Sequence, residues 1–419
     1  LPRRAHADTD ASMNSDAMSS DTSSDTSKSV APFKPITDVY EVEILLPGGA
    51  DTDYWLGYRG DTIPAHVKGG LRTPPPTQPT APPNYLYVPD TTPGMGGNGL
   101  MHMLDFFNDV LLAITDHETT NHDTGKVTAL TGDPNGTVPS IAVQRAAVIT
   151  PNSPFAYVVG PGVGMVFTGG LNVGANSLDT NRLGKLVDPN AVGNGKETIF
   201  STNIVSLLTS MRHDDIQAVL NGKFLPSLKR FAAGRDASQQ ATQEVAELLN
   251  LVKQVKQNQQ DQLANGMLVG RVLFQKGLVG GISLQHNTSY DTHNDAFGTK
   301  QMQNYQSLTM SLYRAHLDAK QNGVKFRSVE KSDFNRIKPA SDHYKYGGTL
   351  VFGQGVSGHR KVGVFNAEKS YVGEKSNSAD IQQHLLGLNG LVGADLGVKT
   401  ALTGITGPHR IQDLLDQQS

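Results

Sequence analysis

Leu278-Val-Gly-Gly-Ile-Ser-Leu284 leads into the polar stretch Ser289-Tyr-Asp-Thr-His-Asn-Asp-Ala-Phe297. The first segment is typical of a buried strand, and the residues after the second have the amphipathic pattern of a long helix. Asp291 and His293 therefore follow the carboxyl end of a predicted strand, which is where ligands bind in open α/β sheets. An oxygen ligand and a nitrogen ligand two residues apart at such a place indicate a metal site.

Strands alternate with helices along the rest of the chain. Val39 to Leu46 predicts the first core strand, which Pro47-Gly48-Gly49 ends. The alternation predicts an α/β fold, a three-layer α/β/α sandwich with a mainly parallel sheet. The other predictions are strands at 154–159, 324–329 and 349–352, a helix running into a strand over 101–114, helices at 138–148, 381–388, 411–415 and up to Asn322-Gly323, a Gly-rich loop through Asn176, and a mainly helical insertion around 197–265.

Composition limits the possible functions. The 419 residues are 37% hydrophobic and 18% charged, with a net charge of −3. This balance favours a globular protein and gives no electrostatic case for nucleic acid or an anionic membrane surface. No apolar run approaches the ~20 residues that span a bilayer. Because the chain has no cysteine, disulfides, thiolate zinc sites, cysteine nucleophiles and a cysteine-type sulfatase are excluded.

The N-terminal segment differs in composition from the rest. Residues 1–33 form a low-complexity acidic tail rich in Ser, Asp and Thr, and 34–419 form the α/β domain. Ala5-His6-Ala7 has the small-x-small form of a signal-peptidase site and follows Arg3-Arg4, although no apolar segment precedes it. We therefore expect an exported protein, periplasmic or at the cell surface.

The sequence lacks the complete form of three familiar nucleotide-binding and hydrolase motifs. Gly353-x-Gly355-x-x-Gly358 formally fits a dinucleotide fingerprint, but the sequence after it predicts a strand, so no helix N-terminus would hold a pyrophosphate. Gly193-Asn-Gly195-Lys196 lacks the earlier glycine and the Ser or Thr of a P-loop. No Gly-x-Ser-x-Gly elbow of a serine hydrolase is present.

Carboxylates and imidazoles also follow the other predicted strands. Taken singly, each is more often a turn or capping residue, but together they predict a site for one or two divalent ions, Zn, Mn or Ca. Two ions ~4 Å apart can hold the attacking and leaving oxygens of an ester displacement. The groups are Asp51, the segment 117–123 with His117, Glu118, Thr119, Thr120, His122 and Asp123, then Asp291 and His293, Asp333, and Asp342 with His343.

The order of these motifs resembles the alkaline phosphatase/sulfatase superfamily. Within it, the chain looks like a bacterial exported family of unknown function whose members often carry a twin-arginine signal. The resemblance runs from about residue 38 to the C-terminal helices. Its motifs are Gly48-Gly49-Ala50-Asp51, the His-containing segment ending at Gly132, Asp291-Thr292-His293, Ser332-Asp333-Phe334-Asn335-Arg336, and Asp342-His343 before the strand that ends at Gly353.

The resemblance implies hydrolysis of a phosphate or sulfate ester in a metal-lined cleft. Asp51 and Asp333 would share one ion, and Asp291, His293 and His343 would hold the other. Thr119 or Thr120 would supply the nucleophile, and Arg336 would clamp the anion with its planar fork. The chain departs from the family pattern where Asp333 replaces Glu and Asn335 replaces Gly, and where the loop after Asp51 lacks Gly-Leu-Asn.

A second interpretation belongs to another class of function. The chain could be a non-catalytic exported protein of the same fold, assembling into a filament or surface layer through its N-terminal tail. The first interpretation expects a small anionic ester or glycan as the partner. The second expects further copies of this chain.

Overall fold

The computed structural model describes residues 38–51, 86–90, 99–150, 157–159, 175–177, 261–277, 279–293, 295, 299–337, 342–365, 371–372 and 376–391. The chain divides into Leu1–Pro32 and Phe33–Ser419, and all described residues belong to the second unit. The predicted tail, most of the predicted helical insertion and the predicted helix at 411–415 lie outside the described residues.

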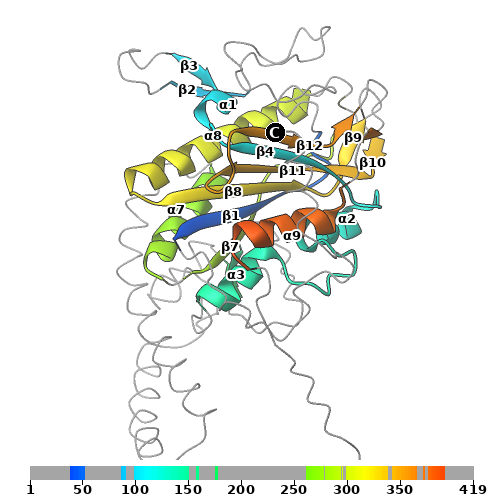
Figure 1. The fold of residues 1–419 in the computed structure, drawn as a ribbon. Helices are drawn as coiled ribbons and strands as arrows, with labels where there is room; N and C mark the ends of the chain where they lie inside the picture. The colour runs from blue at the N-terminus through cyan, green and yellow to red at the C-terminus, as the bar shows by residue number, and fades with distance from the viewer. Residues whose placement is uncertain are drawn as a thin grey trace, which may run out of the picture. The chain divides into compact units, whose positions relative to one another are not determined.

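A sheet of eight strands runs through the described part of the chain (Figure 1). Strand β11 is antiparallel to both of its neighbours, and every other adjacent pair is parallel. This confirms the predicted mainly parallel sheet. In spatial order the strands are β12 (His359–Val362), β4 (Val110–Asp116), β11 (Tyr346–Gly353), β8 (Lys325–Ser332), β1 (Val39–Leu46), β7 (Gly281–Gln285), β5 (Tyr157–Val159) and β6 (Ala175–Ser177).

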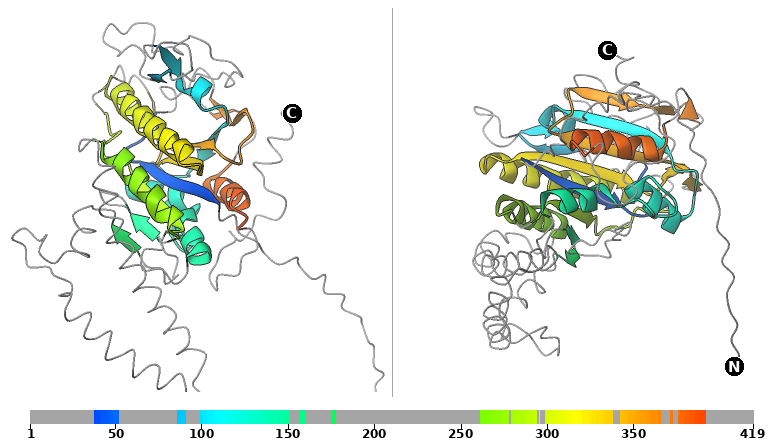
Figure 2. Two further views of the ribbon diagram at one scale, coloured as in Figure 1. Left: turned by 90° about the vertical axis from the view of Figure 1, so that its left-hand side faces the viewer. Right: turned by 60° about the horizontal axis from the view of Figure 1, so that its bottom comes forward.

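Helices cover both faces of this sheet (Figure 2). On one face lie α7 (Gln262–Gln275) and α8 (Thr299–Gln321), and on the other lie α2 (His122–Thr131), α3 (Ile141–Ile149) and α9 (Ser378–Leu388). Successive side chains of β4 alternate between the two cores: Leu112 packs on the α7 side and Leu111 on the α9 side. The three-layer α/β/α arrangement is therefore confirmed.

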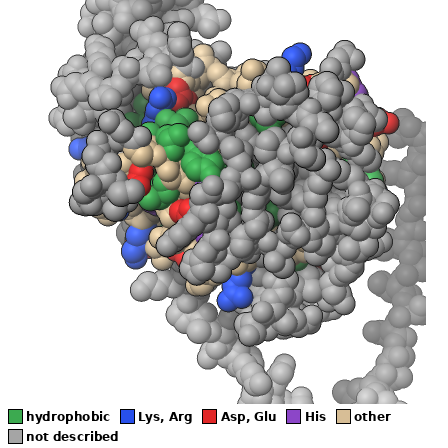
Figure 3. All heavy atoms as spheres, turned by 90° about the horizontal axis from the view of Figure 1, so that it is seen from above, with side chains coloured by type: hydrophobic (Ala, Val, Ile, Leu, Met, Phe, Trp, Pro, Cys, Tyr) green, Lys and Arg blue, Asp and Glu red, His purple; other side chains and the backbone are tan. Residues whose placement is uncertain are grey.

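Smaller elements lie around the sheet. They are β2 (Tyr87–Pro89) with β3 (Leu100–His102), α1 (Met103–Phe106), β9 (Asn335–Ile337) with β10 (Asp342–Tyr344), and β13 (Val364–Phe365) with β14 (Tyr371–Val372). Seen from above, described side chains of both charge signs are interspersed with apolar ones (Figure 3), in keeping with a net charge of −3. None of the described helices has the length and hydropathy needed to cross a membrane.

Buried charges on the central strands are paired across the sheet. β1 is buried along its whole length, including Glu41 and Glu43. Glu43 accepts a hydrogen bond from Lys331 Nζ at 2.6 Å, and Glu41 pairs with Arg327. Burial alone would raise the pKa of Glu41, but the cationic side chains beside it outweigh burial and hold that pKa below its usual range. These pairs allow a charged strand to lie at the centre of the fold.

Several elements differ from the predictions in type or bounds, and one strand runs against the others. Ala175–Ser177 forms β6, where a loop was predicted, because pairing with β5 satisfies its backbone. β11 is antiparallel because no crossover helix separates it from β8. β7 begins at Gly281, later than predicted, where a Cβ would lie only 1.6 Å from the Ala142 carbonyl oxygen of α3. The predicted strand after Gly358 is present as β12.

Candidate metal centre

The predicted site residues come from segments that meet at one edge of the sheet. β1, β4, β7 and β8 are parallel, so their carboxyl ends lie together. β11 begins at this edge, with Tyr346 opposite Asp116. The predicted motifs follow these strands, so residues up to about 290 positions apart converge here.

Two glycines join three of these segments. Gly48 and Gly49 turn the chain after β1 with φ of +100° and +83°, a region that favours glycine. Their N–H groups donate to Asp333 Oδ1 at 3.1 and 2.7 Å. A Cβ at Gly48 would lie 2.3 Å from the Asp291 nitrogen, and one at Gly49 would lie 2.5 Å from the Phe334 ring. The loops after β1, β7 and β8 can therefore pack this closely only around glycines.

His122 is the first residue of α2. The side chain of Asn121 caps this helix by accepting from the N–H groups of Asp123 and Thr124. His122 Nδ1 lies 3.0 Å from Asp333 Oδ2, and its Nε2 lies 3.8 Å from Asp291 Oδ2. The cap and the Asp333 contact thus direct the other ring nitrogen toward the loop after β7.

His343 reaches the same place from β10. Its Nδ1 donates to the Thr120 carbonyl oxygen at 2.9 Å, which leaves the Nε2 lone pair facing the site. The Phe334 ring lies beneath it, with ring centroids 4.4 Å apart. Burial, aided by Arg336 and the neighbouring imidazoles, lowers the pKa of His343. The ring is therefore neutral at physiological pH and is able to bind a cation.

Arg336 is fully buried beneath these groups. Its Nε donates to the Gly48 carbonyl oxygen at 2.7 Å, and its Nη2 donates to Asp291 Oδ1 at 2.5 Å. Its Nη1 lies 3.3 Å from His293 Nδ1. In this arrangement the guanidinium binds protein groups and fixes the Asp291 carboxylate. The anion-clamp role predicted for it stays a prediction.

His293 lies between two members of the site. Its Nε2 is 3.1 Å from His343 Nε2 and 3.3 Å from Asp291 Oδ1. Because its Nδ1 faces the guanidinium of Arg336, which can only donate, Nε2 carries the proton. His293 thus acts here as a hydrogen-bond donor toward those two acceptors.

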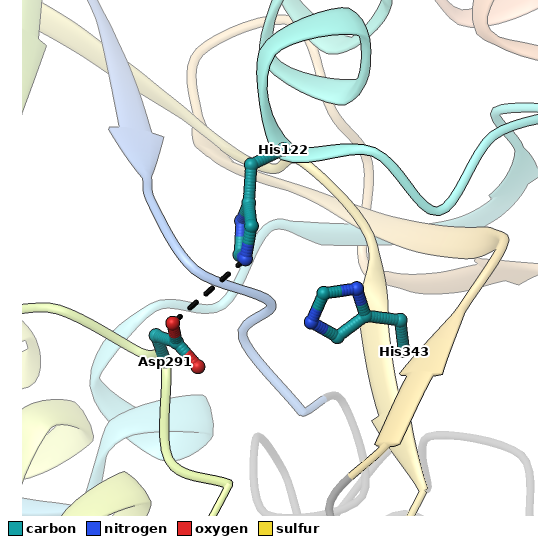
Figure 4. A group of neighbouring side chains, drawn as sticks. All are labelled: His122, Asp291 and His343. Atoms are coloured by element: carbon teal, nitrogen blue, oxygen red, sulfur yellow. Dashed lines mark ion pairs between the residues drawn. The ribbon is translucent and has the colours of Figure 1, made fainter.

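Three ligand atoms converge in the described part of the chain. One atom each from His122, Asp291 and His343 lies within 4.8 Å of the other two (Figure 4), and we call these residues the three-ligand group. Two imidazoles and a carboxylate are a donor set for zinc or a related divalent ion, with a position left open. Tetrahedral zinc bonds of about 2 Å place ligands roughly 3.3 Å apart, so a modest inward movement completes the fit.

Other predicted ligands lie outside this group. Asp51 is fully buried, and its backbone carbonyl accepts from the Tyr305 hydroxyl at 2.8 Å. Asp333 binds the two glycines and His122, as described above. Asp342 is exposed and accepts from the His343 N–H at 2.8 Å. Of the predicted metal set, the three-ligand group therefore includes Asp291 and His343.

The two predicted nucleophiles lie in the loop before α2. Thr119 Oγ1 accepts from the Asn121 N–H at 3.1 Å, closing a local turn. Thr120 is exposed and offers its carbonyl oxygen to His343. The two threonines thus contribute to the shape of the loop, and their predicted catalytic role is not tested by these contacts.

His122 is the site residue that sequence reasoning did not single out as a ligand. It stood within the polar segment 117–123 beside His117, which is instead buried against Ser378, with its Nδ1 2.7 Å from the serine Oγ. The available signal was Asn121, a preferred N-cap residue, which would place His122 at the helix start.

Comparisons with known proteins give little further information. No protein-family model matches the sequence, and no curated protein matches it. Among solved structures, the alkaline phosphatase from the Antarctic bacterium TAB5 aligns with a TM-score of 0.39 and 11% identity, over 85% of this chain and 99% of that one. A mutant of that enzyme with Mg bound aligns with a TM-score of 0.37 and 10% identity, over the same shares.

Proposed function

We propose that this protein is a metal-dependent hydrolase of phosphate or sulfate esters. The observation that supports the proposal is the three-ligand group at the carboxyl edge of the sheet. Its two imidazole nitrogens favour Zn²⁺ or Mn²⁺ over Ca²⁺, which prefers six to eight oxygen ligands. A bound ion would supply a Lewis acid that stabilises charge developing on the ester oxygens.

The chain's own residues prepare the site for such an ion. Arg336 holds the Asp291 carboxylate, and Asp333 holds the His122 ring. The Phe334 ring supports both imidazoles, with centroids 4.6 Å from His122 and 4.4 Å from His343. Ligands oriented in this way are pre-organised, which is what a catalytic metal site requires.

Access to the site suits a small substrate. In the three-ligand group the side chains of His122 and Asp291 are 31% and 40% exposed, and that of the neighbouring His293 is 50% exposed, so the site can be reached from solvent. We therefore propose a small anionic ester as the substrate. Export, supported by the Ala5-His6-Ala7 motif, would place the reaction outside the cytoplasm, and cell fractionation would test that location.

The test combines metal analysis with turnover of a generic aryl phosphate and aryl sulfate. Asp291→Asn removes the charged ligand and keeps an oxygen for Arg336, so the buried guanidinium is not left unpaired. We expect the variant to lose bound metal and to lose more than about 100-fold in turnover, beyond the 10–100-fold typical of outer-shell partners.

Asp123→Asn is the matched control, because that carboxylate is 85% exposed on the same helix turn as His122. The control should keep metal and activity. Wild-type protein that binds no divalent ion and turns over neither ester would overturn the proposal, and would favour the non-catalytic interpretation of the same fold.

A further inference from the structure

Asp333 has a role that differs from the one implied by the family resemblance. Its carboxylate is fully buried and engaged by three groups: the N–H of Gly48, the N–H of Gly49 and Nδ1 of His122. We infer that Asp333 is a positioning residue, which turns His122 Nε2 toward a single cation held with Asp291 and His343, and that it does not bind an ion itself. The inference rests on the metal site proposed above.

The directions of these hydrogen bonds fix the state of the His122 ring. A carboxylate only accepts, so the imidazole must donate from Nδ1 to Asp333 Oδ2 across the 3.0 Å contact. In a neutral imidazole the other nitrogen then carries the lone pair. A carboxylate that receives the second N–H of a ligating histidine is a recurrent way of orienting that ligand.

Among the described residues, no acceptor lies within hydrogen-bond distance of His122 Nε2 to hold a proton there. Its neighbour Asp291 Oδ2 is 3.8 Å away, which is too long for a hydrogen bond. His343 presents an unprotonated Nε2 for the parallel reason, because its Nδ1 donates to the Thr120 carbonyl oxygen. Two nitrogen lone pairs and a carboxylate oxygen thus converge on one place. The His343 lone pair accepts from His293 Nε2 at 3.1 Å in this structure, and a bound cation would take the place of that proton.

The same contacts limit the number of ions. Asp333 Oδ1 already accepts two N–H groups and Oδ2 accepts the imidazole, so ligation by Asp333 would break the Gly48-Gly49 turn or release His122. Among the described residues, the three-ligand group is the one set of three or more such side chains that meets. The described site therefore takes one divalent ion per chain.

Asp333→Asn is the informative variant because it reverses one hydrogen bond and preserves shape. The asparagine oxygen must stay on the two glycine N–H groups, since an NH₂ group there would face two donors. The amide nitrogen then replaces Oδ2, which leaves the shared Gly48 N–H on the asparagine oxygen alone, and donates to His122 Nδ1. This moves the ring proton to Nε2. That proton blocks the ligand atom.

The experiment is a titration of metal-free protein with Co²⁺, followed by visible absorption, together with nitrogen NMR of labelled histidines at pH 8. We expect wild-type protein to bind one Co²⁺ and to show His122 protonated at Nδ1, with the signal assigned by its loss in His122→Gln. Asp333→Asn should lose about 10–100-fold in Co²⁺ affinity. It should also shift the His122 proton to Nε2 without unfolding. Asp123→Asn should change neither quantity.

The outcomes separate this inference from the proposed function. Two Co²⁺ per wild-type chain, or an Asp333→Asn variant with unchanged affinity and unchanged His122 tautomer, would overturn the inference while leaving a metal enzyme in place. Wild-type protein that binds no Co²⁺ would overturn the proposed function itself. If Asp333→Asn unfolds, the inference is still tested by the number of Co²⁺ ions bound per wild-type chain and by which ring nitrogen of His122 carries the proton in the wild type.

Discussion

At the scale of single residues, the exposed side chains of the site depend on buried partners. Asp291 and His293 are about half exposed, whereas the Arg336 side chain that contacts both is fully buried. Arg336 also binds the backbone after β1 and β7, through Gly48 and Tyr290. One side chain therefore fixes the distance between two loops and the orientation of a ligand.

Arg336→Lys tests this role while keeping the positive charge. A lysine has one nitrogen and cannot reach the same set of acceptors, so we expect about 3 kcal/mol loss in the free energy of unfolding and a weaker metal affinity. Urea unfolding and Co²⁺ titration measure the two effects. Arg360→Lys serves as control, at an arginine whose Nε donates to the nearby Ser357 carbonyl oxygen at 3.3 Å. If Arg336→Lys and Arg360→Lys have the same free energy of unfolding and the same Co²⁺ affinity, Arg336 does not hold the two loops and Asp291 in place.

At the scale of elements, the start of α2 decides where His122 lies. The helix begins because the Asn121 side chain accepts from Asp123 N at 2.9 Å and Thr124 N at 3.1 Å. Its end at Gly132, with φ of +75°, is an ordinary left-handed C-cap. The helix is short, and its first turn is supported by the cap, by the contact of His122 with Asp333 and by the close packing of Gly125 on the Asp333 backbone.

Asn121→Ala removes the cap, and we expect it to cost about 1 kcal/mol of stability. Because His122 is the first helical residue, fraying of this turn should also weaken Co²⁺ binding by up to about fivefold, the equivalent of 1 kcal/mol. Asn121→Asp preserves the cap and should behave like wild type. Thermal unfolding and metal titration measure both effects, and an unchanged affinity in Asn121→Ala would show that the cap does not position His122.

At the scale of the whole molecule, one buried acid couples folding to pH. Glu330 on β8 is fully buried between Ile44 and Leu350 of the neighbouring strands, and neither of its oxygens makes a hydrogen bond. Ser328 lies two residues away on the same face of β8. Burial raises the pKa of Glu330 to about 8. The folded chain therefore retains a proton that the unfolded chain releases above about pH 4.3.

This difference sets the sign of the pH dependence. Between pH 5 and pH 8 Glu330 is protonated in the folded state and ionised in the unfolded state, so its own contribution to the free energy of unfolding falls by up to about 1.4 kcal/mol per pH unit as the pH rises. Burial of His117 and His286, which lowers the pKa of each to about 4, acts in the opposite direction below about pH 6.5. Below pH 4 the contribution is fully present. Glu330→Gln should remove this contribution, so the free energy of unfolding of the wild type minus that of the variant, measured by urea unfolding at each pH, should fall between pH 5 and pH 8. Glu118→Gln, at an exposed site, should keep the wild-type pH dependence. If Glu330→Gln has the same pH dependence of the free energy of unfolding as the wild type, Glu330 is not the group responsible.

The sequence by itself determined the alternation of strands and helices, and with it the α/β/α class. It also determined that Asp51, Asp291 and Asp333 follow strands whose ends meet. These features depend on local patterns of apolar residues and turn glycines, which are readable without the fold.

Only the tertiary structure decided which atoms face one another. The contact between His122 and Asp333 joins residues 211 positions apart, and no local pattern records it. A hydrogen-bond partner depends on distances of tenths of an ångström between separate loops, and those distances are set by packing around Gly48 and Gly49. Asp333 and Asp291 both follow a strand in the sequence, but their positions in the structure differ. Asp333 is buried behind His122, whereas Asp291 is exposed beside the ring nitrogens of His122 and His343.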